Sequence, residues 1–102
     1  MRNKILTLLG FAQKSGNLLS GENTCELFIK KNKIKLIIIS EEASDNSRNK
    51  FMSLCAAKGI PVINFGTKLE LSSAIGKHNR AIIGIKDQNF TKKILSLYKD
   101  EK

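Results

Sequence analysis

Cysteine, histidine, proline and tryptophan are scarce in this 102-residue sequence, which has two cysteines, one histidine, one proline and no tryptophan. Cys25 and Cys55 form no C-x-x-C pair, and His78 is the only histidine, so the side chains for a zinc site or a disulfide framework are missing. We therefore expect no metal and no other cofactor. Both cysteines have apolar neighbours, which predicts buried free thiols and a cytoplasmic protein.

A long hydrophobic run is also missing, since no apolar stretch approaches the roughly 20 residues that cross a bilayer. The N-terminal segment MRNKILTLLGFAQKSG has a basic tip and an apolar middle, as a signal peptide does. Gln13 and Lys14 interrupt that middle, however, and no small-x-small cleavage site follows. We expect this segment to be a helix of the folded protein, and we expect no membrane association.

Acidic side chains are half as numerous as basic ones, with 9 Asp and Glu against 18 Lys and Arg, and the formal net charge is +9. The excess lies at the two ends of the chain. Residues 1–35 contain 7 basic and 2 acidic side chains and residues 76–102 contain 7 and 3, whereas residues 36–75 contain 4 of each. A small basic protein attracts polyanions, most often nucleic acid. A lysine-rich composition that only favours solubility is the alternative explanation.

Three short runs of β-branched residues indicate buried strands, because their apolar character is continuous rather than alternating. They are IKLIIIS at 34–40, IPVINF at 60–65 and RAIIGI at 80–85.

Helical patterns separate these runs. Residues 43–59 have Ser44 as an N-cap and Gly59 as a stop, and residues 67–76 begin with a capping box of Thr67 and Glu70. Residues 89–99 place four apolar side chains on one helical face. Helices that alternate with buried strands predict an α/β protein, a three-layer α/β/α sandwich with a small mixed central sheet, in one domain spanning 1–102.

The stretch SGENTCELFIKKNK, residues 20–33, begins another helix in an unusual way. Gly21 has no Cβ, so a ligand backbone can approach the free amides at the positive end of the helix dipole. Asn23 adds a side-chain amide that can donate to and accept from a base edge. The alternative is an ordinary surface helix, since Ser and Gly are common caps and Asn in a first turn often faces water.

The sequence contains no complete catalytic motif that we recognise. The G-x-x-x-x-G of GNLLSGEN is followed by Glu22 and Asn23, where a phosphate-binding P-loop has Lys and Ser or Thr. The chain has no G-x-S-x-G elbow, and a pair such as Glu41 and Glu42 after a strand is usually a solvated turn. We expect no enzymatic activity.

With Gly16, Gly21 and Asn23 before and within this helix, then KLIIISEEAS, CAAKGIPV, KLELSSAIGK and AIIGI, the sequence resembles the ribosomal L7Ae/L30e family of kink-turn RNA binders, most of all its small bacterial members of the YlxQ type. The resemblance covers residues 4–95. Kink-turn binders carry G-x-N-E-x-x-K at the helix start. Here Gly21 and Asn23 match, whereas Thr24 and Leu27 replace the Glu and the Lys.

The resemblance implies an RNA interface formed by the start of the helix at 20–31 and the loop at 75–80. Gly21 would allow backbone approach, Asn23 would read a base or a sugar, and the basic residues would neutralise phosphates. His78 and Asn79 would stack on or hydrogen-bond exposed bases. The expected contact residues are Lys14, Gly21, Asn23, Thr24, Lys30, Lys31, Lys77, His78, Asn79 and Arg80.

The predicted function is non-enzymatic binding of structured RNA, ribosomal or ribosome-associated. The alternative from another class of protein is an adaptor whose basic surface meets an acidic partner of the translation or transcription machinery. Both partners would bind electrostatically, so salt dependence does not separate them. Nuclease sensitivity of the co-purifying partner does.

Overall fold

The computed structural model describes residues 2–101 and contains five helices and four strands. In chain order they are α1 (Arg2–Lys14), β1 (Leu18–Ser20), α2 (Glu22–Lys30), β2 (Leu36–Ile39), α3 (Asp45–Lys58), β3 (Val62–Asn64), α4 (Lys68–Ala74), β4 (Ile82–Ile85) and α5 (Gln88–Glu101).

The four strands form one sheet in the order β1-β4-β2-β3. β2 pairs with β3 in parallel and with β4 antiparallel, and β4 also pairs antiparallel with β1. The sheet is therefore mixed, as predicted. All residues of β2 and β4 are buried, which explains why the central strands are the ones with continuous apolar sequences.

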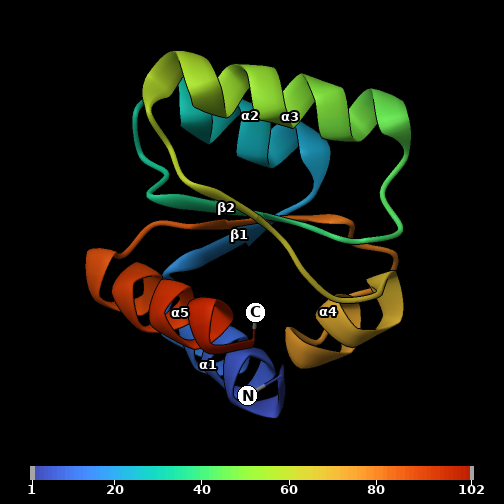
Figure 1. Cartoon of the computed structure of the whole chain (residues 1–102), viewed down its shortest axis with the longest axis vertical. Coiled ribbons are helices and arrows are strands. Elements are labelled where there is room, and N and C mark those ends of the chain that lie inside the picture. The colour runs from blue at the N-terminus through green and yellow to red at the C-terminus, as the bar shows by residue number, and fades with distance from the viewer. Residues whose placement is uncertain (1, 102) are drawn as a thin grey trace.

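The helices cover both faces of the sheet, with α2 and α3 on one side and α1, α4 and α5 on the other (Figure 1). Successive strand residues point to opposite faces, so Ile37 and Ile39 pack in the core beneath α2 and α3, whereas Leu36 and Ile38 pack against the other three helices. The predicted three-layer α/β/α sandwich is confirmed.

The helix starts follow the predicted local signals. The Ser44 hydroxyl accepts a hydrogen bond from the Ser47 amide, and Thr67 and Glu70 form the complete capping box. Gly59 ends α3 in the left-handed conformation, with φ of 69°. The sequence analysis missed β1, since only three residues form it and its partner is the distant β4. Ser20 therefore ends a strand, and α2 begins at Glu22.

Both cysteines are free and buried, as predicted. Burial raises the pKa of the Cys25 thiol to about 12 and the pKa of the Cys55 thiol to about 11. At neutral pH both side chains stay protonated and behave as small apolar residues of the core beneath α2 and α3.

Candidate nucleic-acid interface

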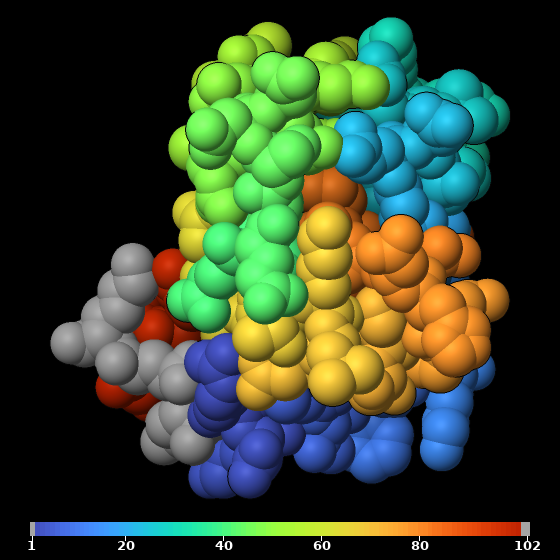
Figure 2. Space-filling model, turned by 90° about the vertical axis from the view of Figure 1, so that its right-hand side faces the viewer, coloured from blue at the N-terminus to red at the C-terminus, as the bar shows by residue number. Residues whose placement is uncertain are grey.

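One edge of the sheet gathers the chain segments that carry the predicted contact residues. The carboxyl ends of β1, β2 and β3 meet the start of β4 there, because Ser20 pairs with Ile83 and Ile39 pairs with both Ile82 and Asn64. Figure 2 looks onto this edge and shows the start of α2 in light blue beside α4 in yellow and the following loop in orange. We call this surface the Gly21 edge.

The start of α2 has an open backbone. Gly21 is its N-cap, with φ of 95° and ψ of 150°, a conformation that is essentially restricted to glycine. The Gly21 amide donates to the Ile82 carbonyl at 2.9 Å, and no side chain caps the helix. A Cβ added to Gly21 would meet nothing within 4 Å, so this position faces open space.

The loop between α4 and β4 is attached directly to the end of β1. The Arg80 Nε donates to the Ser20 Oγ at 3.0 Å, and the Arg80 amide donates to the Ser72 Oγ at 2.8 Å. A third bond joins the Arg80 Nη1 to the His78 carbonyl at 3.1 Å. Asn79 adopts a positive φ of 55°, which turns the chain sharply between His78 and Arg80. Arg80 thus positions the loop against α2 in addition to carrying charge.

These segments enclose two adjoining hollows. The first, of about 450 Å³, lies between the start of α2 and the loop and is lined by Gly21, Glu22, Asn23, Lys68, Asn79, Arg80, Ala81 and Ile82. The second, of about 660 Å³, lies between α4 and the loop and includes Lys77 and His78. Lys68 lines both hollows, and the sequence analysis missed it. Its place at a capped helix start after a strand was the signal that could have identified it.

The structure brings together only some of the ten predicted residues. Gly21, Asn23, Lys77, His78, Asn79 and Arg80 line the two hollows, and exposed Thr24 follows in the first turn of α2. Lys14 ends α1, before β1, and Lys30 and Lys31 are at the far end of α2. These three lysines lie at the opposite edge of the sheet. The two basic ends of the chain therefore do not converge on one surface.

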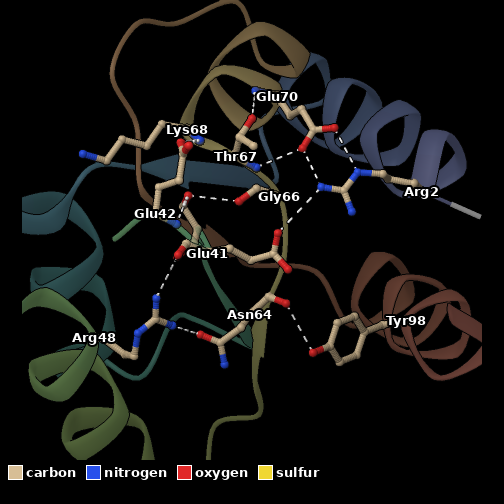
Figure 3. Close-up of polar contacts among 11 residues, drawn as sticks. Arg2, Glu41, Glu42, Arg48, Asn64, Gly66, Thr67, Lys68, Glu70 and Tyr98 are labelled. Carbon is tan, nitrogen blue, oxygen red and sulfur yellow. Dashed lines mark hydrogen bonds and ion pairs between the residues drawn. The ribbon is translucent and has the colours of Figure 1, made fainter. Parts of the chain in front are cut away.

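Glu41 and Glu42 hold the scaffold of the Gly21 edge together (Figure 3). The Glu42 carboxylate accepts a hydrogen bond from the Lys68 amide at 2.8 Å, at the start of α4. The Glu41 carboxylate lies 3.8 Å from the Arg2 guanidinium. The pair thus joins the β2–α3 connection to α4 and to α1.

Arg2 and Glu70 form a second link between α1 and α4, with Nε–Oε2 and Nη2–Oε1 distances of 2.9 and 2.6 Å. The Arg2 guanidinium, with help from the Thr67 amide, lowers the pKa of the Glu70 carboxyl to about 2. The lowered pKa favours the folded state above pH ~4.5, and this contribution disappears as the pH falls toward 2. Both side chains are partly exposed, so water screens the pair.

Glu70→Gln is expected to lower the free energy of unfolding by about 1 kcal/mol at pH 7. Gln at this position keeps the capping box, so the change removes mainly the charge. Urea unfolding of both proteins between pH 7 and pH 2 measures the effect, and the difference should shrink below pH ~4.5. A difference that stayed constant down to pH 2 would show that the ion pair is not its cause.

Among residues 2–101, no three His, Cys, Asp or Glu side chains lie together in a way that could hold a metal ion. No helix within that range is long and apolar enough to cross a membrane.

The fold and the Gly21 edge define a class of small α/β/α sandwich proteins with a mixed four-stranded sheet and a helix start exposed beside a basic loop. The chain belongs to the Ribosomal protein L7Ae/L30e/S12e/Gadd45 family, whose sequence profile matches residues 3–96. The family resemblance seen in the sequence is confirmed.

Two relatives share the name RNA-binding protein YlxQ. The protein from Bacillus subtilis (strain 168) is 31% identical over 90 residues, which are 88% of this chain and 90% of the relative. The protein from Enterococcus faecium is 30% identical over 96 residues, which are 94% of this chain and 92% of the relative. The similarity to members of the YlxQ type thus extends over nearly the whole chain.

Solved structures that are similar to this fold include the following two. A protein of unknown function from Bacillus halodurans C has a TM-score of 0.89 and 36% identity, with 92% of this chain and 95% of that chain covered. The Giardia lamblia 15.5kD RNA binding protein has a TM-score of 0.79 and 20% identity, with 93% and 84% covered. The second similarity supports the fold alone.

Proposed function

We propose that this protein binds structured RNA without catalysing a reaction, and that the Gly21 edge is its RNA interface. The observation that carries the proposal is the attachment of loop 75–80 to the end of β1, directly before α2, through the Arg80–Ser20 hydrogen bond. This attachment places an open helix start, two side-chain amides and several cations around neighbouring hollows. RNA recognition uses such mixed surfaces, because exposed bases and phosphates are contacted together.

Each residue of the Gly21 edge has a role in this proposal. Gly21 allows a sugar or phosphate to approach the first amides of α2. Asn23 hydrogen-bonds a base or a sugar, and Lys77 and Arg80 neutralise phosphates. His78 and Asn79 are exposed and contact splayed bases. Lys68 adds a cation that the sequence alone did not indicate.

The RNA-binding names of the relatives support this function over the adaptor alternative. We further propose that the RNA is ribosomal or ribosome-associated and that the protein acts in the cytoplasm. Sedimentation of cell extract through a sucrose gradient, with and without ribonuclease, tests the proposal. Comigration with ribosomal subunits that disappears after ribonuclease treatment is expected, whereas a nuclease-resistant protein partner would favour the adaptor.

Kink-turn specificity depends on Thr24 and Leu27, which replace the Glu and Lys of kink-turn binders. Both side chains are exposed, and Leu27 retains 49% of its accessible surface. Substitutions here therefore change the surface offered to RNA with little effect on the core. We propose that the chain binds kink-turns with a weaker preference over plain duplex than members with the full motif show.

Asn23→Ala is expected to weaken RNA binding by about 1–3 kcal/mol if the amide makes a bidentate contact. The salt dependence should stay nearly unchanged, because no charge is removed. The double change Thr24→Glu with Leu27→Lys should raise the preference for a kink-turn over a duplex. Fluorescence titrations of both RNAs with the three proteins, each checked by a thermal melt, measure these effects.

Folded variants that all bind the two RNAs as the wild type does would contradict the proposed interface. A double variant with unchanged preference, alongside a weakened Asn23→Ala, would instead leave the interface in place and remove the kink-turn proposal.

A further inference from the structure

The edge of the sheet opposite the Gly21 edge carries most of the unbalanced positive charge. It joins the end of α1, the segment from the end of α2 to the start of β2, the end of α3 and the end of β4. Among the described residues, these segments contain one carboxylate, that of Asp87. They also contain six lysines that have no carboxylate partner there: Lys14, Lys31, Lys33, Lys35, Lys58 and Lys86. The Gly21 edge, by contrast, mixes its cations with Glu22, Glu41, Glu42 and Glu70.

A hollow of about 440 Å³ lies within this lysine-rich edge, between the ends of α2 and α3 and the start of α5. Two cations line it, Lys35 and Lys58. The Lys58 ammonium donates to the Asn32 side-chain oxygen at 3.0 Å, which holds it at the rim. Gln88, the first residue of α5, adds a neutral polar side chain.

Thr91 also lines this hollow, and its unpartnered hydroxyl is the clearest sign of a ligand. Thr91 is 2% exposed, and its Oγ1 has no hydrogen-bond partner among the described residues. A buried hydroxyl without a partner costs free energy, so such groups in folded proteins need an explanation. Asp87 does not satisfy it, because the Asp87 carboxylate caps the Phe90 amide at 2.8 Å.

Two lysines, a threonine with an unpartnered hydroxyl and the first residue of the 14-residue helix α5 line this hollow, and an anionic oxygen acceptor suits all of them. We infer that the hollow binds a phosphate group of RNA, so that one protein molecule contacts RNA at two opposite edges. This inference builds on the proposed RNA-binding function and adds a second contact to it. The remaining lysines of the edge would follow the same strand on either side of the bound phosphate.

The test compares three proteins in RNA titrations at several salt concentrations. Lys35→Gln with Lys58→Gln should weaken binding roughly 20-fold at ~0.1 M salt and make the salt slope shallower by about 1.4, the value of two lost single-strand phosphate contacts. Lys93→Gln with Lys99→Gln is the matched control, since it removes two charges from α5 outside the three hollows described above. The control should change affinity and slope much less.

Thr91→Val separates binding from folding, because it keeps the shape of the side chain and removes only the hydroxyl. The melting temperature should stay the same or rise, while RNA affinity falls roughly tenfold, as expected for a lost hydrogen bond to a charged group. A lower affinity without loss of stability supports the site. An unchanged affinity with a higher melting temperature would overturn it.

The outcomes distinguish this inference from the proposed function. Wild-type protein that binds no RNA would remove both. Wild-type binding that depends on Asn23, together with full binding by the Lys35/Lys58 variant, would keep the Gly21 edge and remove the second contact. In a third outcome, inorganic phosphate shifts the Gln88 and Thr91 amide resonances, but the lysine changes leave RNA affinity unaltered. That result would assign the hollow to a small phosphate ligand and overturn the RNA contact.

Discussion

Gly21→Val is expected to abolish measurable RNA binding and to lower the free energy of unfolding by about 1–3 kcal/mol. The binding loss follows from the open space next to Gly21, which a branched side chain would fill just where a sugar or phosphate would approach the α2 amides. The stability loss has a different origin. No atom lies within 4 Å of the added Cβ, so the strain comes entirely from a φ of 95° that side-chain-bearing residues rarely adopt.

Gly16→Val is the matched control for this prediction. Gly16 also has a positive φ, of 76°, and open space around an added Cβ, but it lies before β1, at the edge opposite Gly21 and outside the hollow lined by Lys35 and Lys58. Both variants should lose stability, and only Gly21→Val should lose RNA binding. Urea unfolding and RNA titration below the melting temperature of each variant measure the two effects. Equal RNA binding by the two folded variants would contradict the role of Gly21.

Arg80→Ala is expected to weaken RNA binding by about 2 kcal/mol or more, roughly 30-fold, because it removes a charge and the attachment of the loop together. Arg80 donates through Nε to Ser20 and through Nη1 to the His78 carbonyl. Without these bonds, the segment that carries His78 and Asn79 no longer has a fixed position relative to α2. A mobile loop must be ordered when RNA binds, and this ordering costs free energy that a loop already held in place does not require.

Two further variants divide this effect into its parts. Arg80→Lys keeps the charge and loses the planar fork of donors, whereas Ser20→Ala keeps the arginine and removes its acceptor. Ser20→Ala should weaken binding without changing the salt slope, and Arg80→Ala should make the slope shallower by about 0.7. A slope unchanged in Arg80→Ala would show that this guanidinium contacts no phosphate. Full binding by Ser20→Ala would show that the attachment is unnecessary.

The two-edge arrangement also changes how the net charge is understood. The sequence locates the basic excess at the chain ends, and a single interface would need both ends to meet. The fold instead places Lys14 and Lys31 at the edge opposite loop 75–80. β1 crosses the sheet from the Lys14 edge to the Gly21 edge, and α2 returns across it to Lys31. Charge counted along a sequence predicts the kind of partner, whereas the strand order decides which edge meets it.

The sequence alone determined the features that depend on local chemistry. The all-apolar runs of β2 and β4 identify buried strands because their side chains meet a core on both faces. Thr67 and Glu70 identify a helix start because each caps the backbone of the other within four residues. Gly21 was also visible, since its place between Ser20 and a polar first turn marks a helix start with no Cβ at the cap.

Only the tertiary structure decided the features that depend on residues far apart in the chain. β1 has three residues, too few to show a period, and its backbone hydrogen bonds come from β4, more than 60 positions later. The Arg80–Ser20 bond likewise spans 60 residues, and Thr91 lines one hollow together with Lys35 and Lys58 only because α5 packs beside the ends of α2 and α3. Which distant residues become neighbours is determined by the order in which strands pair and by the face on which each helix packs. No local pattern encodes that order.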